Sequence, residues 1–287
     1  MNKETLVEIQ EKTGIRPKSI MSVGGGSISE AFIITTATEK LFLKFHKDVL
    51  AYDMFEKEGQ GLRVIQETNT IATPKIHFVN QAFQGAYLIM DYIETKPASS
   101  KDHALLGSQL AELHHNSISY FGLDHVNFIG PIKQMNTPFD DWTDFYIENR
   151  IYPQLELAVQ NGFIASEEIM SKEKLKTTCS HYFNEIQPAL LHGDLWSGNY
   201  IIAKDGTPYL IDPALYYGHS EVDIAMTKLF GGFDTEFYKA YYEIQPQPEH
   251  PQAYQDLYQL YYLLVHLNLF GSSYYSGVKR ILDRYFI

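Results

Sequence analysis

The most constraining stretch of the sequence is 200-YIIAKDGTPYLI-211, in which two apolar runs flank an Asp-Gly pair. Asp-Gly between two such runs is a strong signal for a β-hairpin with a two-residue turn. With Asp205 and Gly206 at the centre of the turn, Asn199 is expected to face Asp212 at the open end of the hairpin. Directly opposed Cβ atoms lie about 4.5–5.5 Å apart. Two oxygen ligands at that separation could hold one hard cation such as Mg²⁺.

The residues before the hairpin extend this pattern. His192-Gly193-Asp194 is followed by Asn199 five positions after Asp194, which is the D-x-x-x-x-N spacing of a kinase catalytic loop. In that chemistry an Asp orients the acceptor hydroxyl and takes its proton, while an Asn and a second Asp hold metal against the phosphates. Asp, Asn and Gly also make ordinary turns. The full spacing favours a phosphoryl-transfer site, with Asp194 as base and Asn199 and Asp212 as metal ligands.

A glycine-rich segment, 24-GGGSIS-29, lies between two predicted strands. Glycines allow backbone N–H groups to approach a phosphate closely, which makes Gly25, Gly26 and Ser27 candidate nucleotide-binding residues. Taken alone, a glycine run is more typical of a flexible turn. The segment also lacks the full G-x-G-x-x-G form, so its weight depends on the residues that follow it.

Those residues are a lysine and a glutamate. Lys44 lies in the apolar strand 41-LFLKF-45, on the same face as Phe42, and Glu58 lies on the next predicted helix. A strand Lys paired with a helix Glu orients the nucleotide phosphates in kinases. Singly, Lys44 is more typical of a solvated strand edge and Glu58 of a solvated helix face. The chain order of glycine loop, Lys, Glu and catalytic loop favours the functional interpretation.

The order of the predicted elements indicates an α+β fold with two lobes. Strand patterns predominate up to residue 93, and helical patterns predominate afterwards, broken only by the hairpin. We therefore predict a small β-rich lobe over residues 1–93 and a larger, mainly helical lobe over residues 94–287. The predicted helices of the first lobe span residues 1–13 and a segment ending near 65, and its predicted strands span residues 19–23, 31–36, 41–45, 75–79 and 86–93.

Composition excludes several classes of protein. The formal net charge of −12 does not suit a nucleic-acid binder, which needs basic surface. No apolar run reaches the roughly 18 residues of a membrane span, and the charged N-terminus does not read as a secretory signal. The single cysteine, Cys179, excludes an internal disulfide framework and favours the reducing cytoplasm. The sequence does not determine the oligomeric state.

Two further residues allow more than one interpretation. Trp196, two positions after Asp194, is either a wall of the acceptor pocket or a packing residue. Asp223 opens the apolar helix predicted after residue 220, where it is either a residue of the first helical turn or an internal anchor for the catalytic loop. The pair His114-His115 shows no metal-ligand pattern.

Together these motifs resemble the fructosamine kinase (ketosamine-3-kinase) family, which belongs to the larger group of kinase-like folds that includes aminoglycoside and choline kinases. The HGD-x-x-x-x-N pattern is shared by the whole group. The Trp in 190-LLHGDLWSGNYI-201, the DPA and YGHSE of 211-IDPALYYGHSEVDIAM-226 and the segment 229-LFGGF-233 are more specific. The resemblance extends from about residue 20 to 271, nearly the whole chain.

The resemblance implies a role for each matching residue and a protein-kinase-like fold. It also contains one departure, because several relatives carry a Cys where this chain has Ser27. For the nucleotide, it implies ATP-phosphate binding by Lys44 paired with Glu58, adenine binding by the Asp91 C=O and Ile93 N–H of a hinge, and Mg²⁺ binding by Asn199 and Asp212. For the catalytic loop, it implies that Asp194 is the base and that His192 and Asp223 support the loop. It implies substrate contact by Trp196 and His219, although the roles of His219 and Glu221 stay ambiguous.

The implied reaction is ATP-dependent phosphorylation of the 3-hydroxyl of a ketosamine, the adduct of a reducing sugar and an amine. The phosphorylated adduct is unstable and releases the amine. Bacterial members are expected to favour ribulosamines or erythrulosamines over fructosamines. Two alternatives stay open, a kinase of another small molecule such as an aminoglycoside or choline-like alcohol, and a non-catalytic nucleotide-binding scaffold. A protein kinase is disfavoured because no APE-like motif ends an activation segment.

Overall fold

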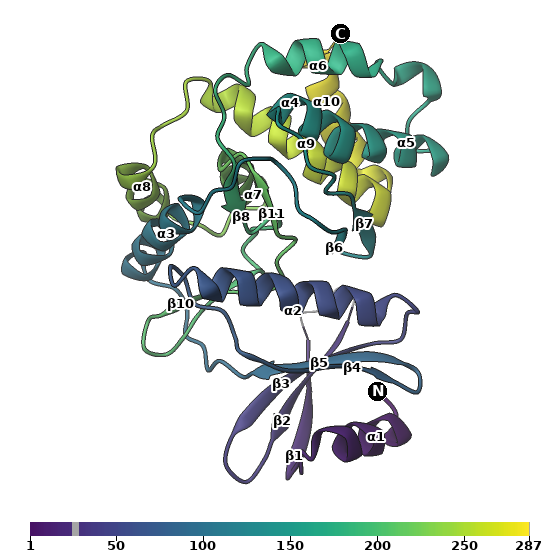
Figure 1. Cartoon of the computed structure of the whole chain (residues 1–287), viewed down its shortest axis with the longest axis vertical. Coiled ribbons are helices and arrows are strands. Elements are labelled where there is room, and N and C mark those ends of the chain that lie inside the picture. Colours follow the sequence, from purple (N-terminus) through teal and green to yellow (C-terminus); the bar gives the residue numbers. More distant parts are fainter. Residues whose placement is uncertain (25–28, 287) are drawn as a thin grey trace.

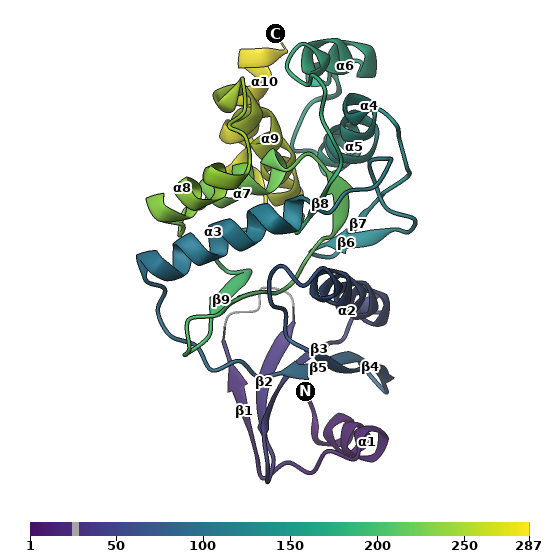
Figure 2. The same cartoon turned by 60° about the vertical axis from the view of Figure 1, so that its left-hand side comes forward.

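A computed structural model describes residues 1–24 and 29–286. Its N-terminal part is a five-stranded sheet with α1 against one face and α2 against the other, and α2 lies between the sheet and the helical remainder of the chain (Figures 1 and 2). The sheet ends at Asp91 and helix α3 begins at Ser100. The lobe boundary near residue 93 stays a prediction.

The elements follow one another along the chain, with three short 3₁₀ or π-helical turns between the α-helices. The α-helices are α1 (Lys3–Thr13), α2 (Ala51–Glu67), α3 (Ser100–His114), α4 (Trp142–Tyr146), α5 (Tyr152–Gln160), α6 (Lys172–Ser180), α7 (Glu221–Leu229), α8 (Thr235–Ile244), α9 (Pro251–Phe270) and α10 (Tyr275–Tyr285). The strands are β1 (Ser19–Val23), β2 (Glu30–Thr35), β3 (Lys40–His46), β4 (Ile76–Ala82), β5 (Gly85–Asp91), β6 (Asn127–Ile129), β7 (Ile132–Gln134), β8 (Ala189–Leu191), β9 (Tyr200–Ile202), β10 (Pro208–Leu210) and β11 (Tyr216–Gly218). The turns are Ile147–Ile151 (π), Ser166–Glu168 and Ser272–Tyr274 (3₁₀).

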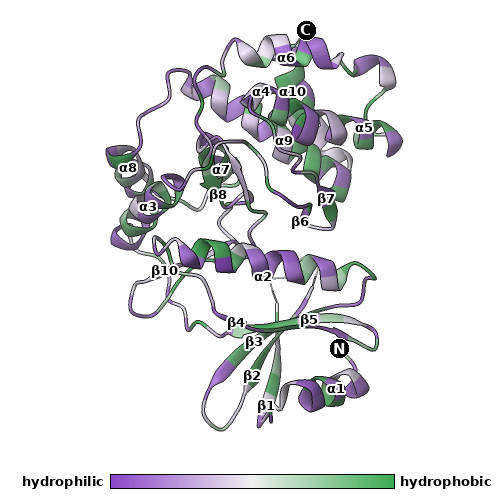
Figure 3. Cartoon of the chain, in the orientation of Figure 1, coloured by the Kyte–Doolittle hydropathy of each residue, from purple (hydrophilic) through white to green (hydrophobic). Residues whose placement is uncertain are grey.

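The sheet has the order β1-β2-β3-β5-β4, and all its neighbouring strands are antiparallel. Its middle is predominantly hydrophobic (Figure 3) because successive residues point to opposite faces and both faces are covered. Along β5, Tyr87 and Ile89 pack with Ile9 of α1, whereas Leu88 and Met90 pack on the face covered by α2. All five predicted strands and both predicted helices of this part are present.

The same alternation decides where the lysine of β3 points. Leu43 and Phe45 belong to the cluster on the α1 side, and Phe42 packs on the α2 side. Lys44 pairs with Leu88 in the ladder and therefore shares the α2 face. Because β3 lies between β2 and β5, it is an interior strand. The alternative of a solvated edge lysine was wrong.

The hairpin is present, but its predicted register was wrong by one residue. Ile202 pairs with Pro208, so the loop is the three-residue segment 204–206 rather than a two-residue turn. Gly206 has a φ of 95°, the left-handed conformation that ends a three-residue hairpin loop. As a result Asn199 lies opposite Ile211, whose N–H donates to the Asn199 carbonyl at 3.0 Å.

The linker between the two parts is bonded along the outside of this hairpin. Lys96 N–H donates to the Ile202 carbonyl at 3.0 Å, and Lys204 N–H donates to the Glu94 carbonyl at 2.9 Å. The Glu94 carboxylate also pairs with the ammonium groups of Lys40 and Lys204. The linker therefore connects the hairpin to the end of the sheet.

The C-terminal part is built around α9, whose buried face centres a large hydrophobic cluster with α5, α7 and α10. The prediction that only the hairpin interrupts the helices was wrong, because β6 pairs with β7 and β8 pairs with β11. These pairs are three residues long, too short for a period-two pattern to reveal. Among the described residues, no helix combines the length and apolar character that a membrane span requires.

Helices α3 and α8 approach so closely that one glycine is required between them. A Cβ built on Gly107 would lie 2.1 Å from the Phe237 carbonyl oxygen, whereas one on Gly59 of α2 has ordinary contacts, the nearest with Val79 Cγ2 at 3.5 Å. We expect Gly107→Ala to lower the free energy of unfolding by about 1–3 kcal/mol, because the helices must separate. Gly59→Ala should leave it unchanged or raise it by up to about 1 kcal/mol. Urea unfolding measures both, and equal effects would contradict this close approach.

Candidate active site

A cavity of about 560 Å³ lies between the sheet with α2 and the C-terminal part. It collects side chains that are far apart in the sequence. Gly25, Gly26 and Ser27 lie outside the described residues, although Gly24 and Ser29 on either side of them line the cavity. The predicted site residues that line it are Lys44, Glu58, Asp91, Ile93, Asp194, Trp196, Asn199 and Asp212.

Lys44 joins three elements in the middle of the cavity. Its Nζ lies 3.0 and 2.9 Å from the two carboxylate oxygens of Glu58 on α2, and 2.6 Å from Asp212 Oδ1 after the hairpin. Burial would lower the pKa of Lys44, but the two carboxylates raise it above its ordinary value. The side chain is therefore a protonated cation held in a fixed place.

Asp212 reaches this position through its backbone conformation. The shifted register places Ile211, not Asp212, opposite Asn199. Asp212 itself has a φ of 55°, which is uncommon for a residue other than glycine. This conformation ends the strand and is compatible with the carboxylate facing the cavity. Strain of this kind persists where the surrounding structure enforces it, often at functional sites.

Asp194 and Asn199 are bonded to each other. Asn199 Nδ2 donates to the Asp194 backbone carbonyl at 2.8 Å and to Asp194 Oδ2 at 3.2 Å. Burial, followed by the nearby Asp212 carboxylate, raises the pKa of Asp194 to about 7. Within residues 1–24 and 29–286, the amide oxygen of Asn199 and Oδ1 of Asp194 accept no hydrogen bond from another side chain or backbone group.

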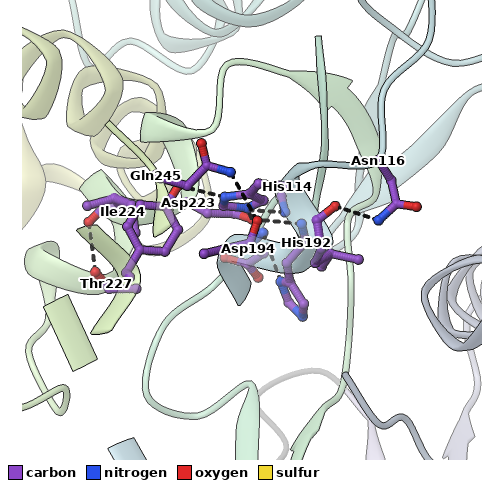
Figure 4. A network of polar contacts seen from close by, with 12 residues as sticks. His114, Asn116, His192, Asp194, Asp223, Ile224, Thr227 and Gln245 are labelled. Atoms are coloured by element: carbon purple, nitrogen blue, oxygen red, sulfur yellow. Dashed lines mark hydrogen bonds and ion pairs between the residues drawn. The ribbon is translucent and has the colours of Figure 1, made fainter. Parts of the chain in front are cut away.

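The backbone of the catalytic loop is held by a fully buried carboxylate. Asp223 accepts hydrogen bonds from His192 N–H at 2.7 Å and from Gly193 N–H at 2.9 Å (Figure 4). Gly193 has a φ of 84°, and a Cβ there would lie 2.1 Å from the Ala214 carbonyl oxygen. Both interpretations of Asp223 hold, since it lies in the first turn of α7 and also anchors the loop.

His192 is fixed as a neutral imidazole. Its Nε2 lies 2.8 Å from the Ile211 carbonyl oxygen and must donate to it, while its Nδ1 accepts from the Asp194 N–H at 3.2 Å. Burial lowers the pKa of His192, in agreement with this neutral form. The ring therefore links the catalytic loop to the strand that precedes Asp212.

Sequence reasoning missed two residues that support the same loop. His114, on α3, lies with Nε2 3.1 Å from Asp223 Oδ2 and Nδ1 2.8 Å from the Tyr241 hydroxyl on α8 (Figure 4). Tyr262 of α9 donates its hydroxyl to the Gly193 carbonyl at 2.8 Å. The sequence around His114 carries no local pattern that indicates this contact. The apolar helix that carries Tyr262 gave no sign of a polar contact.

Trp196 and His219 have different environments. Trp196 is 38% exposed, lines the cavity and covers Gly198, so it lies at the wall rather than in the core. His219 does not line the cavity, and its Nδ1 lies 2.6 Å from the Tyr258 hydroxyl. Burial lowers the pKa of His219 to about 3. This environment gives the predicted substrate contact of His219 no support.

The other wall of the cavity was not predicted. Asn127, Phe128 and Gly130 of the β6–β7 hairpin line it, facing α2. Asn127 Nδ2 donates to the carbonyl of Leu215 at 2.7 Å, and Leu215 follows Asp212 by three residues in the sequence. Three-residue strands and the turn between them carry no periodic signal in the sequence.

The oxygen donors in the cavity fit a magnesium ion. No group of three or more His, Cys, Asp or Glu side chains among residues 1–24 and 29–286 could hold a metal ion by itself. Mg²⁺ is commonly bound by one or two protein oxygens together with substrate phosphates. Asp212 and the amide oxygen of Asn199 are donors of this kind.

The sequence matches known proteins over its whole length. The model of the family described as fructosamine kinase matches residues 1–287. A probable ketoamine kinase of Lactiplantibacillus plantarum is 38% identical over 93% of this chain and 94% of its own length. A chloroplastic protein-ribulosamine 3-kinase of Arabidopsis thaliana is 39% identical over 93% of this chain and 82% of its own length.

Solved structures agree with this match. A crystal structure from Thermobifida fusca, named provisionally as a fructosamine-3-kinase, has a TM-score of 0.85 at 30% identity and covers 99% of this chain and 98% of its own. The wider group of aminoglycoside phosphotransferases shares the kinase-like fold, with a TM-score of 0.65 at 14% identity for one of its members.

Glu221 provides a pH-dependent test of the packing behind the site. Its carboxylate is 7% exposed and accepts from the Tyr242 hydroxyl at 3.0 Å. Burial raises the pKa of Glu221 from 4.5 to about 7. The folded protein therefore favours the protonated acid. The free energy of unfolding should fall as pH rises from about 4.5 to 7, because ionisation is easier in the unfolded chain.

We expect Glu221→Gln to reduce that loss of stability, since the amide stays neutral at every pH. Thermal unfolding midpoints at pH 5 and pH 8 measure the effect. Glu243→Gln, on the exposed face of α8, is the matched control and should behave as the wild type. The same pH dependence in Glu221→Gln and wild type would contradict the raised pKa.

Proposed function

The chain belongs to the fructosamine kinase family, and from that premise we propose that it transfers the γ-phosphoryl group of ATP to the 3-hydroxyl of a ketosamine. The observation that carries this proposal is the convergence of Lys44, Asp194, Asn199 and Asp212 on one cavity. These four residues come from the sheet, the catalytic loop and the end of the hairpin. A scaffold that only bound nucleotide would not need the aspartate of the loop.

Asp194 is proposed as the base that receives the acceptor proton. Asn199 donates to Asp194 Oδ2, which leaves Oδ1 to accept a hydrogen bond from the 3-hydroxyl. The anchoring of the loop by Asp223 keeps this carboxylate in place before substrate arrives. As the hydroxyl oxygen bonds to phosphorus, its proton passes to Asp194 and ADP leaves.

The nucleotide is proposed to lie along the sheet side of the cavity. Lys44 is placed to contact the phosphates, and Glu58 keeps its ammonium group oriented. Asp91 and Ile93 line the cavity at and just after the end of β5, where we propose that the Asp91 C=O and Ile93 N–H bind adenine. Mg²⁺, held by Asn199 and Asp212, would supply charge neutralisation for the phosphates.

The acceptor is proposed to be a ribulosamine or a related ketosamine. The Arabidopsis relative is named for ribulosamine, and the half-exposed Trp196 ring offers an apolar wall beside Asp194. The flat, apolar face of the indole suits the side of a sugar that presents C–H groups rather than hydroxyls. We place the reaction in the cytoplasm on the basis of the single, buried Cys179.

The proposal predicts different defects for two aspartates. Asp194→Asn should keep Mg·ATP binding and lower kcat by about 10²–10⁴-fold, because the general base is lost. Asp212→Ala should weaken Mg·ATP binding, because it removes a metal ligand and a partner of Lys44. Calorimetric titration and initial rates separate the two, with Asp205→Asn in the hairpin loop as control. A near wild-type rate for Asp194→Asn would refute the assignment of the base.

The reaction itself is tested with Mg·ATP and a panel of acceptors: ribulosyl-lysine, fructosyl-lysine, free lysine, choline and kanamycin. Phosphate transfer to a ketosamine, followed by release of lysine, is the expected result. The ratio of ribulosyl to fructosyl rates identifies the preferred sugar. Transfer only to choline or kanamycin would support a kinase of another amino alcohol, and tight ATP binding without any transfer would support the scaffold alternative.

A further inference from the structure

One cation in the cavity has no role in the mechanism above. Lys57 precedes Glu58 on α2, is half-buried and lines the cavity. Its Nζ donates to the side-chain amide oxygen of Gln60 at 3.0 Å. In the described part of the chain, no carboxylate oxygen lies within 4.0 Å of this ammonium group. A half-buried lysine with only a neutral partner is an available site for an anion.

The helix face that carries Lys57 is directed at the catalytic segment. Asp53, one turn earlier, has the i, i+4 spacing that favours an ion pair on a helix surface, yet the structure pairs Lys57 with Gln60 instead. One turn later, a Cβ on Gly61 would lie 3.0 Å from the ring of Pro213, the residue after Asp212. Lys57 therefore lies on the side of α2 that faces the metal-binding end of the hairpin.

The charges around the cavity make this lysine distinctive. The described lining residues include four carboxylates, those of Glu58, Asp91, Asp194 and Asp212. They include two lysines, and Lys44 is already neutralised by two of the carboxylates. Among these lining residues, Lys57 is thus the cation without a carboxylate partner. The phosphates of a nucleoside triphosphate are repelled by these carboxylates. Their binding therefore requires positive charge beyond that of Lys44.

We infer that Lys57 is a second phosphate-binding cation, which contacts the terminal phosphoryl group of the nucleotide as that group is transferred. The inference rests on the proposed function. In the transfer, the bond from the γ-phosphorus to the bridging oxygen of ADP breaks and a bond to the acceptor oxygen forms. Lys57 stays protonated throughout and stabilises the charge on the moving oxygens, as positioned cations do in other phosphoryl transfers. A lysine suits this task because its stem is flexible and its charge is compact.

The test compares Lys57→Met, which removes the charge and keeps most of the length of the side chain, with Lys57→Arg, which keeps the charge. Arg63→Met is the matched control, because Arg63 is exposed on the same helix and does not line the cavity. Calorimetry without acceptor measures the affinities for Mg·ATP and Mg·ADP. Lys57→Met should weaken Mg·ATP binding by about tenfold or more, the effect of one lost charge-assisted hydrogen bond, and change Mg·ADP binding far less.

Turnover gives the second readout. With a ribulosamine that carries no carboxylate or phosphate as acceptor, Lys57→Met should lower kcat by about 10–100-fold while the KM for that acceptor changes little. Lys57→Arg should recover part of the rate, and Arg63→Met should match the wild type. Circular dichroism and the thermal midpoint confirm that each variant is folded.

Three results would overturn the inference. Equal weakening of Mg·ATP and Mg·ADP would mean that Lys57 only adjusts the overall charge of the cavity. A defect seen only with acceptors that carry a carboxylate or phosphate would place its contact on the acceptor. Wild-type binding and rates in Lys57→Met would leave it without a role. Because nucleotide binding is measured without acceptor, a wrong assignment of the ketosamine would not affect that result.

Discussion

The structure of the site depends on the ion pairs of Lys44 with Glu58 and Asp212. They join an interior strand of the sheet, the helix packed on that sheet and the end of the hairpin at one point. A buried lysine is stable only because two carboxylates compensate its desolvation. The same compensation makes Asp212 a shared ligand, since it holds Lys44 in the free protein and is proposed to hold metal when nucleotide is present.

A second buried carboxylate, that of Asp223, organises the loop that carries the proposed base, Asp194. Asp223 accepts hydrogen bonds from two backbone N–H groups and contacts the His114 ring. Backbone donors fix the geometry of a carboxylate more tightly than a mobile lysine would. Because α3, α7, α8 and α9 all contribute to this arrangement, the position of Asp194 depends on the packing of the whole helical part.

The sequence predicted which residues meet at the cavity better than it predicted how they are arranged there. The spacing of Asp194 and Asn199, and the order of Lys44 and Glu58, depend on chemistry that allows few alternatives. The hairpin register failed because Asp-Gly also closes a three-residue loop, and only packing distinguishes the two loops. The β6–β7 wall and His114 were missed for another reason, because their roles come from contacts between distant segments that no local pattern records.

The hydrogen bonds between the linker and the hairpin have a mechanical consequence. A linker without hydrogen bonds to its surroundings would let the two parts rotate freely. Residues 94–96, however, are hydrogen-bonded to β9 and to the loop that follows it. Rotation of the sheet about this linker must either break these bonds or carry the hairpin along. The strands next to Asn199 and Asp212 are thereby part of the joint itself, so a rotation that keeps these bonds also moves the oxygens that are proposed to bind metal.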